Sequence, residues 1–382
     1  MTGAVTPVLV IGGGVAGAAV AAHLAQAGRS VLLVERRDGP HHKVCGEFVS
    51  GEAALYLDDL AVDLAALGAV RMRRVRLGTR RNVATASLPF PAWSVSRRVL
   101  DEAVLAAAAE RGAIIRRGRG VRALAPHGRS WIATLDDGDT IAAAEVFLAT
   151  GKHDLRGWKR PSGAQDDLIA FKLHWRLAPD AMAALGAGVE LTLFPGGYAG
   201  LEPVEDGIAN LCLVVRQRHF AALGRRWEAL LAALCAASPL LAQRLDGAMP
   251  CWSRPLAIAS IPYGYVALET NGMWRLGDQA AVIPSFTGDG LALALHSGRL
   301  AAHTLLARRS AHHFHAELHR QLRNQLTLAT VLSRALVAQP QQTVLALTAR
   351  VFPATLRAVA SHTRLPSEYL IARLPKNSCA PA

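Results

Sequence analysis

The sequence predicts an α/β protein, α+β overall, in which a parallel sheet is interrupted by an inserted antiparallel sheet and followed by helices. Three observations lead to this prediction. Apolar runs alternate with small-residue helices over the first forty or so residues and again from about residue 270. Between residues 168 and 215, alternating apolar and polar residues are divided by glycine turns, as in a meander of strands. About eighty C-terminal residues carry mainly helical patterns.

The N-terminal segment has the order strand, glycine turn, helix, strand, acid. The run VLVI at 8–11 meets GGGVAG at 12–17, and a second apolar run at 31–34 ends at Glu35. This order is the dinucleotide-binding fingerprint of a Rossmann-type domain. Gly12 permits the tight turn, Gly14 lets the backbone approach a pyrophosphate, and Gly17 lets the helix pack closely on the sheet. Glu35 is positioned to accept hydrogen bonds from a ribose. The motif alone does not separate FAD from NAD.

Composition limits the class of protein. The chain has 382 residues, of which 51% are apolar, so it can bury a large core. Its five cysteines (45, 212, 235, 251 and 379) form no CxxC pair, which predicts reduced thiols in a cytoplasmic protein. We expect no signal peptide, because the first strand begins almost at Met1, and no membrane-spanning segment, because no apolar stretch is long enough.

The net charge of +13 is concentrated in the C-terminal region. Residues 299–382 contain eleven Lys or Arg and two acids, which gives +9. A basic face of this kind is typical of a solvated helix surface, of contact with the inner face of a membrane, or of an acidic carrier or substrate. The sequence does not choose among these three interpretations, and we expect no nucleic-acid partner.

The remaining elements follow in order. Helices are expected over 52–67, from Ser96 to about 111, over 225–245 and from Gly290 onward. Short strands are expected over 114–121, 131–135 and 140–142, and a buried strand over 146–151 that ends in a glycine turn. The expected domains are a discontinuous nucleotide-binding domain (1–155 and 270–310), an antiparallel substrate domain (156–269) and a basic helical C-terminal region (311–382).

A second glycine-rich segment lies about 260 residues after the first. Gly277 and Asp278 follow a short strand, and Gly288-Asp289-Gly290 opens a helix after Pro284. An acid at a strand end followed by a helix N-terminus suits the second half of a long cofactor. Asp278 could bind ribityl hydroxyls, and the helix dipole could face the part of a flavin that becomes negative on reduction.

Together these stretches resemble the FAD-dependent oxidoreductase superfamily typified by p-hydroxybenzoate hydroxylase, geranylgeranyl reductases and flavin-dependent halogenases. The matching stretches are the first fingerprint, Ser96-Arg97-x-x-Leu100-Asp101, Ala149-Thr150-Gly151 and the segment from Gly277 to Gly290. The resemblance implies FAD, reduced by NADH or NADPH. It implies cofactor contacts from Gly12, Gly14, Val15, Ala16, Gly17, Glu35, Arg36, Cys45, Gly46, Arg97, Val121, Thr150, Gly151, Gly277, Asp278, Pro284, Gly288, Asp289, Gly290 and Leu291.

Two details are similar to the geranylgeranyl-reductase-like branch. The segment Lys43-Val44-Cys45-Gly46-Glu47 resembles that branch's cysteine–glycine loop beside the flavin. Residues 195–203 keep the prolines and Tyr198 of its PxxYxWxFP pattern, but Gly200 stands in place of the tryptophan and Glu202 in place of the phenylalanine. These departures argue against a standard C20 prenyl pocket. The halogenase pattern WxWxIP is absent.

The expected activity is an FAD-dependent oxidoreductase acting on a hydrophobic small molecule of aromatic, polyketide or isoprenoid type. An NAD(P)H-using monooxygenase is favoured slightly, because of the altered motif. A C=C reductase and a non-redox flavin-dependent cyclase or isomerase also fit the sequence.

Three residues are candidates for catalysis: Cys45, Tyr198 and Glu202. Each also has an ordinary structural explanation, namely a small loop residue, a packed aromatic ring and a solvated strand position. His174 and the group His312, His313, His315 and His319 are interpreted as non-functional, and no metal site is predicted.

Overall fold

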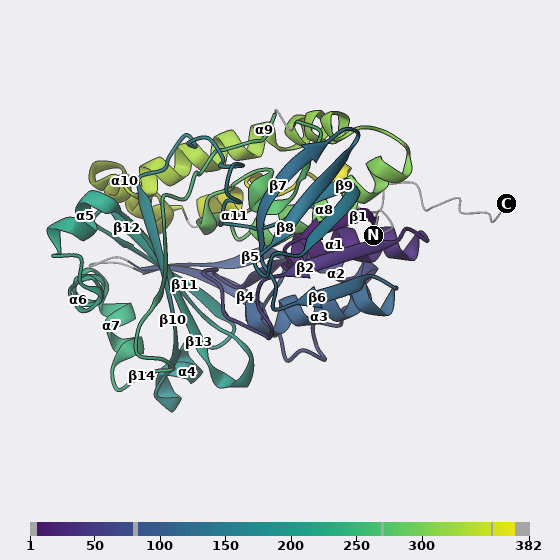
Figure 1. Cartoon of the computed structure of the whole chain (residues 1–382). Coiled ribbons are helices and arrows are strands. Elements are labelled where there is room, and N and C mark those ends of the chain that lie inside the picture. Colours follow the sequence, from purple (N-terminus) through teal and green to yellow (C-terminus); the bar gives the residue numbers. More distant parts are fainter. Residues whose placement is uncertain (1–5, 79–82, 269–270, 353, 371–382) are drawn as a thin grey trace.

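The computed structural model describes residues 6–78, 83–268, 271–352 and 354–370. Two sheets lie side by side, and helices from the C-terminal third run along both of them (Figure 1). The expected mixture of a parallel sheet, a second sheet and a helical C-terminal region is confirmed.

The first sheet contains the glycine fingerprint. Its strand order is β6-β2-β1-β9-β8-β7, with β16 beside β9. The pairs β1–β2, β1–β9, β2–β6 and β9–β16 are parallel, whereas β7, β8 and β9 form an antiparallel meander. The strands are β1 (Thr6–Ile11), β2 (Val31–Glu35), β6 (Ile114–Arg117), β7 (Val121–His127), β8 (Ser130–Leu135), β9 (Thr140–Leu148) and β16 (Trp274–Arg275).

Three helices pack on one face of this sheet: α1 (Val15–Gln26), α3 (Arg97–Glu110) and α8 (Gly290–Leu306). Ser96 begins α3 as expected, because its hydroxyl accepts a hydrogen bond from the Val99 N–H at 3.3 Å. Buried residues of the meander, including Leu124 and Trp131, pack with Leu9 and Ile11 in a separate core. The ends of β1, β2 and β9 are thereby fixed around the start of α1.

The second sheet has the order β14-β10-β13-β12-β11-β4-β5-β3, with β15 beside β10. It differs from the expected antiparallel insert in two respects. Its strands β3, β4 and β5 come from residues 48–94, inside the range assigned to the nucleotide-binding domain, and β11 pairs with β4 in parallel. The strands are β3 (Phe48–Ser50), β4 (Val70–Gly78), β5 (Val83–Ser94), β10 (Leu168–Arg176), β11 (Gly188–Phe194), β12 (Gly197–Pro203), β13 (Ala209–Arg216), β14 (Met249–Pro250) and β15 (Leu256–Ala259).

Alternation along β10 explains how this sheet is buried on both faces. Phe171, Leu173 and Trp175 point into an apolar core shared with α6 and α7, and the intervening side chains point toward the first sheet and the C-terminal helices. The expected helix over 225–245 is divided at Ser238-Pro239. The helices beside this sheet are α4 (Pro179–Leu185), α5 (Gln217–Ala222), α6 (Trp227–Ala237) and α7 (Pro239–Leu245).

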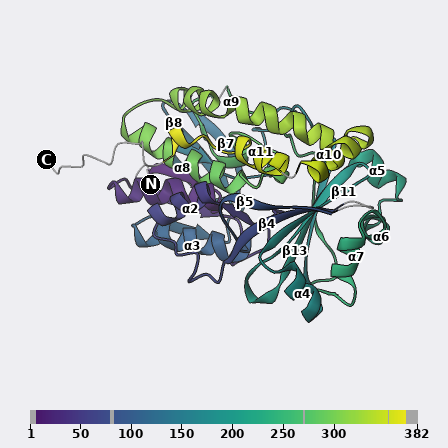
Figure 2. The ribbon, with the colours of Figure 1, turned by 180° about the vertical axis from the view of Figure 1, so that it is seen from behind.

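The C-terminal helices bridge the two sheets (Figure 2). The long helix α9 (Ala311–Leu336) packs on α8, and α10 (Gln339–Val351) and α11 (Ala354–His362) continue toward β5. Gln342 fixes α10 to the second sheet, since its amide donates to the carbonyls of Phe194 (2.9 Å) and Gly197 (3.0 Å). The remaining elements are α2 (Gly51–Asp59) and the short 3-10 turns Glu205–Gly207, Gly277–Gln279, Ser285–Thr287 and Ser367–Tyr369.

Candidate functional site

The turn between β1 and α1 has the geometry of a phosphate-binding loop. Gly12 has φ +108°, and a Cβ atom there would lie 2.6 Å from the Ala149 carbonyl oxygen. At Gly17 a Cβ would lie 2.0 Å from the Gly12 carbonyl oxygen, so this glycine serves close packing of helix and turn. Both constraints leave the N-terminus of α1 open to a ligand.

Basic side chains surround this helix N-terminus. The Nζ of Lys43 and the Nη2 of Arg97 lie 3.3 and 3.6 Å from the position of a Cβ on Gly14. Both cations are held by the buried carboxylate of Asp101, at 2.7 Å from Lys43 and at 2.7 and 3.0 Å from Arg97. Burial opposes the charge on Asp101, but Arg97 and Lys43 bring its pKa below the usual range. Two positive groups and free N–H groups therefore meet where a pyrophosphate is expected.

Glu35 lies at the end of β2, beside the same turn. Its carboxylate accepts hydrogen bonds from the backbone N–H of Gly13 (2.6 Å) and of Arg37 (2.9 Å). These bonds fix the orientation of the side chain, and each oxygen keeps a further lone pair for a ribose hydroxyl. The geometry agrees with the role expected for this acid.

The second glycine-rich segment lines the same cavity as the first. Asp278 forms an ion pair with Lys152 at 2.8 Å, and Gly290 and Leu291 begin α8 beside it. Lys152 lowers the pKa of Asp278 against the opposing effect of burial, so the carboxylate is ionised. The positive end of the α8 dipole and an anionic acceptor thus line the same cavity.

One cavity of about 510 Å³ joins these parts. Most residues predicted to contact FAD line it: Gly12, Gly14, Val15, Ala16, Glu35, Arg36, Cys45, Gly46, Arg97, Val121, Thr150, Gly151, Gly277, Asp278, Gly288, Gly290 and Leu291. The donor set fits FAD, since it offers cations and helix N–H groups for a pyrophosphate and carboxylates for ribose and ribityl hydroxyls.

The other end of the cavity is an apolar wall of the second sheet. It contains Ala170, Val214, Leu256, Ile258 and Ile261, together with the thiol-bearing residue Cys212. The described cysteines 45, 212, 235 and 251 are free thiols, and Cys379 lies outside the described residues. The charged half of the cavity suits a flavin cofactor. The apolar half suits a hydrophobic substrate.

Hydroxyl groups lie where the two halves of the cavity meet. Tyr263 and Ser285 line it, and the Tyr263 hydroxyl donates to the Ser285 hydroxyl at 2.9 Å. Tyr198 reaches the same Ser285 oxygen at 2.9 Å but does not itself line the cavity. Burial raises the pKa of both tyrosines, so both are neutral donors at physiological pH.

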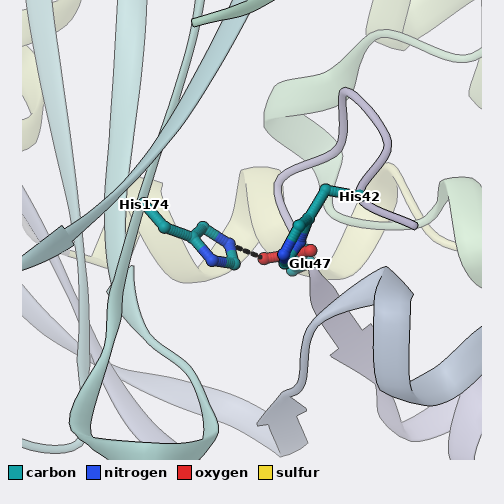
Figure 3. A group of neighbouring side chains, drawn as sticks. All are labelled: His42, Glu47 and His174. Carbon is teal, nitrogen blue, oxygen red and sulfur yellow. Dashed lines mark hydrogen bonds and ion pairs between the residues drawn. The ribbon is translucent and has the colours of Figure 1, made fainter. Parts of the chain in front are cut away.

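Glu47 and His174 form a hydrogen-bonded group of acid and base, with His42 beside them (Figure 3). Glu47, in a left-handed conformation with φ +66°, forms an ion pair with Lys172 and a 2.7 Å hydrogen bond with His174, both on β10. Its carboxylate also accepts the N–H of Arg97 at 2.8 Å. A non-glycine residue with positive φ is strained, and such strain is concentrated at functional sites. Glu47 therefore links the loop beside the cofactor site to the second sheet.

His42 lies beside Glu47 and His174, and all three are residue types that can bind a metal ion. The donor atoms of His42, Glu47 and His174 lie within 4.8 Å of one another. The arrangement nevertheless favours a hydrogen-bonded acid–base cluster, because Glu47 and His174 already contact each other directly and the Lys172 ammonium occupies the other carboxylate oxygen. Burial and the Lys172 charge lower the pKa of His42 to about 4, so this imidazole is neutral.

Five predicted site residues lie outside the cavity lining. Gly17 serves packing, and Pro284 precedes the turn that carries Ser285. Asp289 turns away, accepting hydrogen bonds from Ser50 (3.1 Å) and the Leu365 N–H (2.8 Å). Tyr198 and Glu202 lie on the same face of the second sheet as the apolar wall but do not line the cavity, and Glu202 is 3% exposed.

Sequence reasoning overlooked Lys152, Lys172, Asn210, Tyr263 and Ser285, and it dismissed His174. The sequence offered a signal only for the residues of β10, whose Lys172 and His174 stand at alternate positions of an otherwise apolar strand.

The comparisons with known proteins agree with this geometry. Residues 7–76 match the family described as FAD dependent oxidoreductase. Over this segment the chain is similar to FAD-dependent oxidoreductases, and the cavity that the segment lines fits FAD.

Particular relatives are the menaquinone reductases of two mycobacteria. The chain is 28% identical to that of Mycolicibacterium smegmatis over 323 residues, covering 77% of this chain and 75% of the relative. It is 28% identical to that of Mycobacterium tuberculosis over 326 residues, covering 79% and 76%.

Solved structures of flavin-dependent halogenases share the fold. The brominase Bmp2 superposes with a TM-score of 0.76 at 18% identity, covering 96% of this chain and 95% of that one. The myxobacterial chondrochloren halogenase CndH superposes with a TM-score of 0.74 at 20% identity, covering 95% and 92%. At these identities the similarity concerns the fold alone.

Proposed function

We propose that the protein is an FAD-dependent C=C reductase of the geranylgeranyl-reductase-like branch, acting on a hydrophobic isoprenoid-type substrate such as a prenylated quinone. The observation that carries the proposal is the cavity in which a cofactor half meets an apolar wall with proton donors at the junction. Bound FAD, reduced by NADH or NADPH, would supply hydride to the substrate.

The residues of this chain would bind the substrate, exclude water and donate the proton. The wall formed by Ala170, Val214, Ile258 and Ile261 would hold the hydrocarbon chain and exclude water. Cys45 and Tyr263 lie at the junction and are the candidate donors of the proton that the second carbon needs. A monooxygenase does not need a proton donor for a substrate carbon, so these donors favour a reductase. The similarity to two menaquinone reductases also supports a reductase.

A monooxygenase acting on an aromatic or alkene is the second candidate. Gly200 and Glu202 favour it, since they replace two large apolar residues of the reductase pattern. The non-redox cyclase or isomerase is a third reaction, which can be distinguished by experiment.

A single-turnover experiment separates these activities. The purified holoprotein is reduced without oxygen and mixed with a menaquinone, a geranylgeranyl lipid or a phenol, and the flavin absorbance is followed. Anaerobic reoxidation by an isoprenoid, with a product two hydrogens heavier, supports the proposal. Exposure of the extracted quinone product to air then shows whether the ring or the isoprenoid chain was reduced. A reduced ring is oxidised back to the quinone, whereas a saturated chain stays saturated.

Two outcomes contradict the proposal. Reoxidation only with oxygen, accompanied by an oxygen atom in the product, supports a monooxygenase. Product formation while the flavin stays reduced supports the isomerase.

We also propose that the C-terminal helices contact an anionic membrane that holds the substrate. Val344, Leu347 and Val351 lie on one face of α10 and are 64%, 54% and 57% exposed. Residues 318–367 contain six arginines and no Asp or Glu. An apolar stripe within a segment whose charged residues are all cationic is typical of a helix lying on an anionic lipid surface. In the described parts of the chain, none of the helices combines the length and apolarity needed to cross a bilayer.

A further inference from the structure

The cavity-facing side of the second sheet changes from apolar to polar along its strands. Directly paired residues of β12, β13 and β10 form successive rows: Tyr198, Val214 and Ala170, then Gly200, Cys212 and Lys172, then Glu202, Asn210 and His174. The last row is buried, with 3%, 0% and 4% exposure. Since Ala170, Val214 and Cys212 line the cavity, this polar row begins where the apolar wall ends.

Two acceptors in the polar row have no partner among the described residues. The Asn210 amide is oriented by its Nδ2, which donates to the carbonyls of Cys45 (3.2 Å) and Gly46 (2.8 Å). Its Oδ1 therefore faces away from that loop and is buried without a hydrogen bond from the described part of the chain, as is Oε1 of Glu202. Glu202 and Asn210 are directly paired in register, which places their Cβ atoms about 4.5–5.5 Å apart.

A proton on Glu202 satisfies both groups. An ionised carboxylate can only accept, so it would leave two buried acceptors side by side. A neutral carboxylic acid has one donor, which can bond to the Asn210 oxygen and remove the conflict between the two acceptors.

The charges around Glu202 favour the same state. Glu47 is the acid whose charge affects Glu202 most, and Lys172, His174 and the Arg97 N–H hold the Glu47 carboxylate ionised. Burial, reinforced by the charge of Glu47, raises the pKa of Glu202 well above its usual range, against weaker opposition from Lys172 and Ser94. A second negative charge beside Glu47 is therefore disfavoured.

We propose that Glu202 is a neutral carboxylic acid hydrogen-bonded to Asn210, and that it thereby holds Asn210 against the loop of Cys45. The Oδ1 of Asn210 would accept the carboxyl proton of Glu202, while Nδ2 of the same side chain donates to the carbonyls of Cys45 and Gly46.

The proton on Glu202 can be observed without any substrate. We expect the infrared spectrum of the holoprotein at neutral pH to contain the carbonyl band of a protonated carboxylic acid that disappears in Glu202→Gln. Contributions of bound FAD cancel in the difference spectrum. Asp289→Asn is the matched control, since burial raises the pKa of Asp289 to about 7 and its band must be distinct. Identical spectra of wild type and Glu202→Gln overturn the proposal.

A second variant keeps the test valid if Glu202→Gln does not fold. Asn210→Ala removes the acceptor, so we expect the band to move to the higher frequency of a free carboxylic acid. A band that stays unchanged in Asn210→Ala also contradicts the proposed hydrogen bond.

Discussion

Lys172 on β10 and Glu47 in the loop before β3 form an ion pair in which neither side chain has any exposed surface. The pair joins the strand that forms the cavity wall to the loop that carries Cys45. Removing one partner of a buried pair leaves an uncompensated charge, which is far more destabilising than replacing both.

We therefore expect Lys172→Met to lower the free energy of unfolding by about 3–5 kcal/mol. The double variant Lys172→Met/Glu47→Gln should recover much of this loss, because no charge then remains buried. Urea unfolding of the wild type, the two single variants and the double variant measures the coupling energy between Lys172 and Glu47. Arg116→Met, which breaks the exposed pair with Asp139, is the control and should change stability little. A double variant no more stable than Lys172→Met would show that the pair is not coupled as described.

Glu202 should make stability depend on pH in a defined direction. Its pKa is higher in the folded state than in the unfolded chain, so the folded protein binds more protons above the usual glutamate pKa. The stability of the wild type relative to Glu202→Gln should therefore fall as the pH rises from that usual value toward the raised pKa. Urea unfolding at a series of pH values measures the difference, and parallel pH curves for the two proteins would exclude a proton on Glu202.

Glu47 makes the stability depend on pH in the opposite direction. Lys172 and His174 lower its pKa against the effect of burial. Its contribution to stability is present above the usual glutamate pKa and is lost as the pH falls through the lowered value. Because Glu47 is retained in Glu202→Gln, comparison of that variant with the wild type isolates the effect of Glu202.

Asp278 should determine FAD affinity. Asp278→Ala removes a carboxylate that lines the cofactor cavity and leaves Lys152 without its partner, so we expect FAD to bind about 10- to 100-fold more weakly, as for loss of a hydrogen bond to a charged group. Flavin titration of the apoprotein gives the dissociation constant. Asp180→Ala on exposed α4 is the control, and wild-type affinity in Asp278→Ala would exclude Asp278 from the cofactor site.

Membrane contact should depend on the exposed face of α10. We expect the wild type to cosediment with phosphatidylglycerol-containing vesicles at low salt and to be released as salt screens the arginines. Leu347→Glu should reduce the bound fraction several-fold. Leu55→Glu is the matched control, since Leu55 is 50% exposed on α2. Equal binding of both variants would remove this surface from the proposal.

The local geometry of the first glycine turn could be predicted from the sequence, for a physical reason. A turn that admits only glycine, a helix of small residues and an acid at a strand end are local requirements, so Gly12, Gly17 and Glu35 can be recognised from spacing alone. The same holds for the Ser96 helix cap.

The second sheet was harder to predict because its partners are distant in sequence. Residues 70–94 alternate like any half-buried strands, and nothing local indicates that they pair with a strand more than a hundred residues later. The cluster around Glu47 has the same origin. Lys172 and His174 are about 125 residues from Glu47, and their contact exists only through the register of β10.

The interleaving of the two sheets has a consequence for how such a protein can change over evolution. The chain passes back and forth between the sheets, since β3–β5 and β10–β15 are separated by strands of the first sheet. Neither sheet is thus a contiguous piece that recombination could exchange as a module. New substrate preferences would then arise by replacement of single residues on a fixed frame, and Gly200 and Glu202 stand on the sheet face that carries the cavity wall, Gly200 paired with the lining residue Cys212.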